Sequence, residues 1–235
     1  MRPYRVLAYG DCNTWGWVPV EQGFPSTCYD DPLRWTGVAA RLLSLDYLIE
    51  VDGLSARAID QDDPIDWGTI AGRDLNGRTH LPAAIARAMP LDLVVLLLGT
   101  NDTRADYARS ASDITQSAVS LARLCETCTG VATPYRPPTA LVVAPVPLSA
   151  INHPDQGRFF EGAGPKSRAL GAAMRDAAAA AGLALADAAE AVPETHGTDG
   201  IYLSEDDHLR LGAHLAAAIG RVLPRAPGEG RGAPA

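Results

Sequence analysis

Residues 91–102 read LDLVVLLLGTND, an apolar run that ends in a glycine and three small polar residues. The unbroken apolar part, residues 93–98, is far too short to cross a bilayer, which needs about 20 residues of helix. It has the length of a strand buried on both faces, as in a parallel sheet covered by helices. We therefore predict a central strand over 91–98, with a polar loop at its carboxyl end.

Similar short apolar runs lie on both sides of this stretch, and longer helical patterns separate them. This alternation predicts an α/β protein of three layers, α/β/α, around a five-stranded parallel sheet. The other strands are expected at 5–9, 47–51, 141–144 and 183–186. Helices are expected at 34–43, 81–89, 112–125, 166–181 and 205–222.

The pattern predicts a single domain over residues 1–223. The remaining residues, 224–235, read PRAPGEGRGAPA and have the composition of a disordered tail. Three long segments do not fit the strand and helix pattern: 60–78, 131–139 and 148–165. Long loops in a compact domain are usually functional or poorly ordered.

The composition excludes several classes of partner. The chain has 235 residues, 47% of them apolar, and a net charge of −8. An acidic chain without a basic run argues against nucleic acid and membrane surfaces as partners. The first strand begins within a few residues of the N-terminus and leaves no room for a secretory signal, so we expect a cytoplasmic protein.

Four short polar segments fall where a site is expected. In an open parallel sheet, ligands bind at the carboxyl ends of the strands. Each segment alone is typical of a turn, but their joint occurrence at such ends, or in the last loop, favours a site. The segments are GDCNT (10–14), GLSAR (53–57), GTND (99–102) and DGIY (199–202).

With these segments in this order, the chain resembles the SGNH (GDSL-like) hydrolases, whose blocks run GDS, Gly, GxND and DxxH. It is most similar to their arylesterase/acyltransferase branch, through YGDCNTWGWVPV (9–20), LRWTGVAARL (33–42), HP…FEG and TDGI. The resemblance runs from about residue 5 to residue 222. It implies a flavodoxin-like fold and an acyl-ester hydrolase or acyltransferase that works through a covalent acyl-enzyme without a cofactor.

The resemblance also implies catalytic roles. Cys12 stands at the nucleophile position, and Asp199 at that of the carboxylate that orients the base. The oxyanion hole would consist of the backbone N–H groups of Cys12 and Ala56 with the side-chain amide of Asn101. Tyr202 stands where the family has its histidine.

Further residues are expected to surround the substrate, a small-molecule ester with its acyl acceptor. The tryptophans at 15, 17 and 67 are candidates for the walls of an apolar acyl pocket, and equally for core or subunit contacts. The branch forms oligomers, and residues 60–78 are our candidate for the contact in a homo-oligomer. No phosphate-binding or metal motif is present. The predicted substrate-binding residues are Asp11, Trp15, Ser55 and His153.

The two departures from the family pattern change the expected chemistry. A cysteine would form a thioester, which amines attack readily relative to water, so acyl transfer is favoured over hydrolysis. A phenol, with a pKa near ~10, is protonated at neutral pH and donates rather than accepts a proton. Turnover is therefore expected to be slow, and a disabled scaffold that only binds esters or acids is the alternative. The sequence leaves open whether the departures are natural or engineered.

Two further candidates are considered. His208, six residues beyond Tyr202, could replace the missing base, although a structural role is favoured. Cys125 and Cys128 form a CxxC, which raises a redox or zinc role. Because no second ligand pair accompanies them, we interpret these cysteines as structural thiols.

Overall fold

A computed structural model describes residues 2–132 and 134–224. Its five-stranded sheet is parallel throughout, in the order β2-β1-β3-β4-β5. The predicted α/β fold is therefore confirmed. The strands are β1 (Tyr4–Gly10), β2 (Tyr47–Gly53), β3 (Leu93–Leu97), β4 (Thr139–Ala144) and β5 (Ala184–Asp187).

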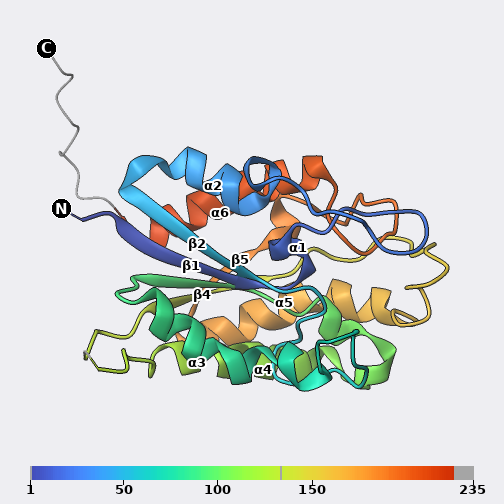
Figure 1. Cartoon of the computed structure of the whole chain (residues 1–235), viewed down its shortest axis with the longest axis horizontal. Helices are drawn as coiled ribbons and strands as arrows, with labels where there is room; N and C mark the ends of the chain where they lie inside the picture. Colours follow the sequence, from blue (N-terminus) through green and yellow to red (C-terminus); the bar gives the residue numbers. More distant parts are fainter. Residues whose placement is uncertain (1, 133, 225–235) are drawn as a thin grey trace, which may run out of the picture.

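Helices cover both faces of the sheet (Figure 1), and they form the outer layers of the predicted three-layer arrangement. Helices α2 and α6 cover one face, while α3, α4 and α5 cover the other. The short helix α1 follows β1 directly. The bounds are α1 (Cys12–Trp15), α2 (Trp35–Leu43), α3 (Gly77–Ala88), α4 (Ala111–Cys125), α5 (Ala163–Ala181) and α6 (Glu205–Val222).

The core is divided by the sheet into two apolar clusters. Successive side chains of a strand point to opposite faces, so Val94 and Leu96 of β3 pack with α3 to α5. Leu93, Val95 and Leu97 pack with α2 and α6 instead. Both faces of β3 are fully buried, which explains why its sequence is an unbroken apolar run.

Several predicted boundaries were wrong by a few residues. Helix α3 begins at Gly77, four residues before the predicted start, because the side chain of Asn76 caps it by accepting from the Thr79 N–H. Helix α5 begins at Ala163 rather than at residue 166. The one-turn helix α1 was not predicted, and it is capped by the Asp11 carboxylate. Of the tail predicted to be disordered, residues 225–235 lie outside the described residues.

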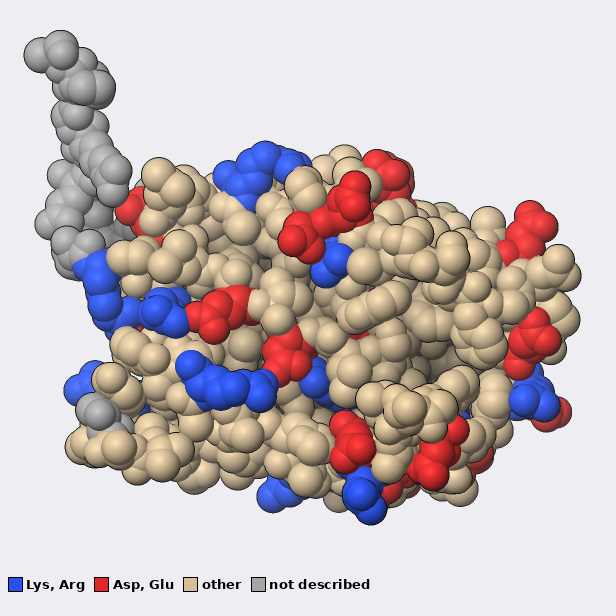
Figure 2. Space-filling model, in the orientation of Figure 1, with Lys and Arg blue, Asp and Glu red and all other residues tan. Residues whose placement is uncertain are grey.

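On the face shown in Figure 2, acidic and basic side chains are interspersed, and they form no extended patch of one charge. None of the helices in the described ranges is long and apolar enough to cross a membrane.

Close packing of α2 against α6 depends on Gly212. Gly220, on the same helix, is a control position because it does not face another element closely. A Cβ atom at Gly212 would lie 2.6 Å from the Cβ of Val38 and 2.8 Å from the carbonyl oxygen of Trp35. On the same helix, a Cβ at Gly220 would meet nothing within 4 Å.

We expect Gly212→Ala to lower the free energy of unfolding by about 1–3 kcal/mol, because the two helices must move apart. Gly220→Ala should raise it by roughly 0.5–1 kcal/mol, since alanine loses less backbone entropy in a helix. Urea unfolding of both variants measures these changes. An equal effect of the two substitutions would contradict the packing role of Gly212.

Candidate active site

Cys12 lies in a tight turn where β1 passes into α1. The Asp11 carboxylate accepts from the Asn13 N–H at 3.0 Å and fixes the start of the helix. A Cβ atom at Gly10 would lie 2.1 Å from the Thr14 hydroxyl oxygen, so only glycine allows this turn to close. Cys12 is 1% exposed and lies just beyond the carboxyl end of β1.

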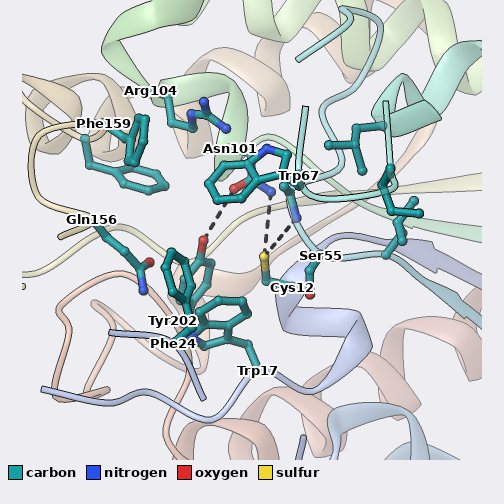
Figure 3. Close-up of a pocket in the computed structure, with 15 residues that line it drawn as sticks. Cys12, Trp17, Phe24, Ser55, Trp67, Asn101, Arg104, Gln156, Phe159 and Tyr202 are labelled. Carbon is teal, nitrogen blue, oxygen red and sulfur yellow. Dashed lines mark hydrogen bonds between the residues drawn. The ribbon is translucent and has the colours of Figure 1, made fainter. Parts of the chain in front are cut away.

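Two hydrogen-bond donors converge on the Cys12 sulfur (Figure 3). The Ala56 N–H donates to Sγ at 3.2 Å, and the Asn101 Nδ2 lies 4.0 Å from it. Ala56 has a φ of +64°, a left-handed conformation that costs a non-glycine residue about 1 kcal/mol. The Asn101 amide is held by the carbonyl of Arg57, to which Nδ2 donates at 3.0 Å. This arrangement can stabilise negative charge beside Cys12.

Tyr202 lies on the other side of Asn101. Its hydroxyl donates to Asn101 Oδ1 at 3.5 Å, and it is near enough to the Cys12 thiol to lower the pKa of that group. Asp199 does not contact the phenol oxygen. Its Oδ1 accepts from the N–H groups of Ile201 and Tyr202 at 2.8 and 2.9 Å, while its buried Oδ2 has no partner. Asp199 therefore orients the backbone of residue 202 rather than its side chain.

Burial keeps the Cys12 thiol and the Tyr202 phenol uncharged at neutral pH. It raises the pKa of the Cys12 thiol to about 11, and the charge of Asp11 adds to this increase. Hydrogen bonds from Tyr202, Ala56 and Asn101 oppose the increase but do not cancel it. Burial also raises the pKa of Tyr202 well above its usual value, and the neighbouring Cys12 contributes. Both groups are therefore protonated at pH 7.

A cavity of about 220 Å³ opens above Cys12. Its walls are mainly aromatic (Figure 3), and the rings contact one another. The Trp17 and Tyr202 ring centroids are 5.0 Å apart, and those of Trp67 and Phe159 are 6.1 Å apart. Such a lining fits a small apolar or aromatic ligand. The aromatic residues that line the cavity are Trp17, Phe24, Trp67, Phe159, Phe160 and Tyr202.

A comparison with protein-family models matches residues 8–221 to the GDSL-like lipase/acylhydrolase family. The chain belongs to this family. A comparison with curated protein sequences finds no match.

Solved structures of esterases are similar to this GDSL-like chain over nearly its whole length. The aryl esterase of M. smegmatis is 39% identical with a TM-score of 0.88, covering 93% of this chain and 99% of that one. A carbohydrate acetylesterase from Sinorhizobium meliloti is 39% identical with a TM-score of 0.87 and the same coverage. Another carbohydrate acetylesterase family member from Sinorhizobium meliloti is 26% identical with a TM-score of 0.83, covering 94% of this chain and 99% of that one. These similarities confirm the SGNH fold and support an esterase of that class.

Three of the predicted substrate residues of this GDSL-like chain do not line the cavity. Helix α1 packs against the end of β2, so Trp15 lies at a separate groove beside Arg34. Asp11 is completely buried beneath the nucleophile turn. His153 is 3% exposed, and its Nδ1 accepts backbone N–H groups instead of facing the cavity. Of the four predicted residues, Ser55 lines the cavity, as do Trp17 and Trp67.

Several cavity residues were missed by the sequence analysis. Phe159, Phe160 and Gln156 belong to the segment 148–165, whose length was the one available signal of a functional loop. Arg104 lies two residues after the GTND segment. Its guanidinium contacts the carboxylates of Asp63 at 2.7 Å and of Asp106 at 2.5 Å, so its charge is already neutralised.

The remaining histidine and cysteine candidates lie elsewhere. His208 is completely buried in α6, where its Nδ1 accepts from the Trp35 N–H, and burial lowers its pKa to about 4. Cys125 and Cys128 are buried thiols that donate to carbonyls of α4, and burial raises the pKa of both. No metal-binding cluster occurs among the described residues.

The raised pKa of Cys12 predicts the pH dependence of its reactivity. Only the thiolate reacts with iodoacetamide, and its fraction increases about tenfold per pH unit below the pKa. We therefore expect the alkylation rate of Cys12 to rise about tenfold per unit from pH 7 to 10, as followed by peptide mass mapping. Tyr202→Phe should slow alkylation further. The hydroxyl of Tyr202 lowers the thiol pKa, so its removal raises that pKa and reduces the thiolate fraction. Cys28→Ser is the control, and a rate that is constant above pH 8 would contradict the assignment.

Burial of Asp11 predicts a pH-dependent stability. Burial raises the pKa of Asp11 to about 7, from about 4 in the unfolded chain. The folded state then binds more protons between these values, so its stability falls as the pH rises from 4 to 7. Asp11→Asn keeps an acceptor for the Asn13 N–H without the charge. Its melting temperature, relative to the parent chain, should be higher at pH 8 than at pH 4. Asp176→Asn, at an exposed position, is the control. If the melting temperatures of Asp11→Asn and its parent change in parallel with pH, the raised pKa of Asp11 is refuted.

Proposed function

We propose that this chain transfers acyl groups from short-chain esters to amines or alcohols in preference to water, through a thioester on Cys12. The observation that carries the proposal is the position of the Cys12 sulfur, which lies beneath an aromatic cavity and beside the Ala56 N–H and the Asn101 amide. The relatives named above as aryl and carbohydrate acetyl esterases support an ester as the acyl donor.

The acylation step forms a carbon–sulfur bond. The Cys12 thiolate, formed by loss of its proton to solvent base, attacks the ester carbonyl carbon, and the carbonyl π electrons move to oxygen. The resulting oxyanion accepts hydrogen bonds from the N–H groups of Cys12 and Ala56 and from the Asn101 amide. Collapse of this intermediate breaks the bond to the alcohol oxygen, which takes a proton from solvent and leaves.

The transfer step restores the thiol. An amine or alcohol attacks the thioester carbon, a carbon–nitrogen or carbon–oxygen bond forms, and the carbon–sulfur bond breaks. The attacking group loses its proton to solvent base, and the Cys12 sulfur leaves as a thiolate. An amine needs little activation because it attacks through a neutral lone pair. Water needs a general base, and none of the described residues that line the cavity is a histidine.

Tyr202 acts as a hydrogen-bond donor in this proposal. A phenol whose pKa lies well above the usual value cannot accept the Cys12 proton at neutral pH. Its hydroxyl instead stabilises the thiolate, since its hydrogen bond lowers the thiol pKa. Asp199 contributes by orienting the backbone of residue 202.

The proposal includes a homo-oligomer with small-molecule partners and no cofactor. Phe24, Ile65 and Ile70 are exposed apolar side chains, and two of them line the cavity. A second copy that packs on residues 60–78 would cover these side chains and narrow the cavity mouth.

A second candidate is a scaffold that binds esters or acids without turnover. The raised pKa of the Cys12 thiol and the protonated phenol favour it, because no group beside the sulfur accepts its proton at pH 7.

One experiment separates these two functions. The protein is incubated with p-nitrophenyl acetate at pH 8 while intact mass and nitrophenol release are followed. We expect a single acetyl adduct that is absent from Cys12→Ala and retained in Cys28→Ala, and faster release when an amine is added. Cys12→Ser/Tyr202→His should hydrolyse the ester at least about 100-fold faster, since it regains a general base.

Absence of both adduct and release in the parent chain, with activity in the double variant, would support the binding scaffold instead. An adduct that survives Cys12→Ala would refute Cys12 as the acyl carrier.

A further inference from the structure

Three polar groups of the residues that line the cavity have no hydrogen-bond partner within the described part of the chain. They are Trp17 Nε1, Ser55 Oγ and Gln156 Nε2, and each atom is buried. The Gln156 side chain is notable because the residue is only 4% exposed and its amide lies beside the aromatic walls (Figure 3). A buried polar group without a partner is costly, and in a binding cavity it indicates a polar group on the ligand.

The position of Gln156 is fixed by a turn folded around His153. The N–H groups of Asp155 and Gln156 both donate to His153 Nδ1, at 3.2 and 3.1 Å. The Gly157 N–H donates to the His153 carbonyl at 2.8 Å. His153 is therefore a positioning residue, and the amide that it presents to the cavity is oriented before a ligand binds.

The unpartnered atoms define the ligand chemistry. The Trp17 indole N–H and the Gln156 Nε2 only donate, while the Ser55 hydroxyl can donate as well as accept, so a hydrogen-bond acceptor on the ligand suits all three groups. An anion does not fit, because the Arg104 guanidinium at the cavity wall is neutralised by Asp63 and Asp106. A neutral oxygen, as in a ketone, amide or ether, fits these donors.

We infer that the cavity selects esters whose aromatic ring carries a neutral hydrogen-bond acceptor oxygen, and that Gln156 is the specificity-determining residue. The aromatic walls pack on the ring, and a cavity of about 220 Å³ accommodates one substituted ring, since an apolar cavity of about 150 Å³ already binds benzene. The inference rests on the proposed function only in taking the ligand to be an ester.

Binding to the Cys12→Ala variant tests the inference without any acyl transfer. The probes are methyl 4-acetylbenzoate and methyl 4-isopropylbenzoate, which differ in a carbonyl oxygen replaced by a methyl group. Titration calorimetry should give a Kd about tenfold lower for the acetyl probe, because the isopropyl probe leaves the buried donors unpaired. This preference should disappear in Cys12→Ala/Gln156→Leu, and it should remain in Cys12→Ala/Gln116→Leu, which alters an exposed glutamine of α4.

A second variant guards against a folding defect. Gln156→Met keeps the length of the side chain and removes the N–H donor without adding a charge, so it too should lose the preference while its melting temperature stays near that of its parent. Equal Kd values for the two probes, a preference that survives both substitutions, or no binding of either probe would overturn the inference. Failure of acyl transfer in the parent chain leaves these binding results unaffected, so the two proposals fail separately.

Discussion

The buried guanidinium of Arg57 is the contact on which the active-site edge of the sheet depends. It donates to the carbonyl of Gly10 at 2.9 Å and to the carbonyl and carboxylate of Asp52 at 2.6 and 2.7 Å, and it stacks over the ring of Tyr9. These bonds hold together the ends of β1 and β2, where the Gly10 carbonyl also accepts from the Leu54 N–H at 3.1 Å. The residue before Arg57 is Ala56, whose left-handed backbone directs an N–H to the sulfur. Because the carbonyl of Arg57 also fixes the Asn101 amide, both donors to the sulfur depend on this one residue.

Burial gives the site its second constraint, because charge is costly wherever water is excluded. A thiol and a phenol are neutral at pH 7, and both tolerate an apolar cavity better than an ionised pair would. The same burial raises the pKa of Cys12 and thereby limits the supply of thiolate. Reactivity at neutral pH therefore depends on the donors around the sulfur, since each stabilises the thiolate more than the thiol.

The sequence predicted the parts of the molecule that follow from local pattern, and it failed where packing between distant segments decides. The central strand could be predicted because burial on both faces leaves an unbroken apolar run. Cys12, Ala56 and Asn101 could be placed together because parallel strands bring their carboxyl ends to one edge. Trp15 and Trp17 could not be distinguished, since only the packing of α1 against β2 turns one of them away from the cavity. Gln156 was missed because its orientation comes from a turn around His153 that no periodicity signals.

The unpartnered oxygen of Asp199 links the two departures from the family pattern. Its Oδ1 is fully used by the backbone of residues 201 and 202, while its buried Oδ2 accepts from nothing. A histidine at position 202 has a ring N–H that could serve such an acceptor, whereas the single hydroxyl of Tyr202 donates to Asn101. The phenol thus gives its hydrogen bond to Asn101, and the hydrogen bonds of Asp199 within the described residues go to the backbone rather than to the phenol. A thiol suits this arrangement better than a serine hydroxyl would, because a thiolate forms without an adjacent base at an accessible pH. The cysteine and the tyrosine therefore suit each other: the tyrosine supplies a hydrogen-bond donor but no base, and the cysteine is the nucleophile that needs an adjacent base less.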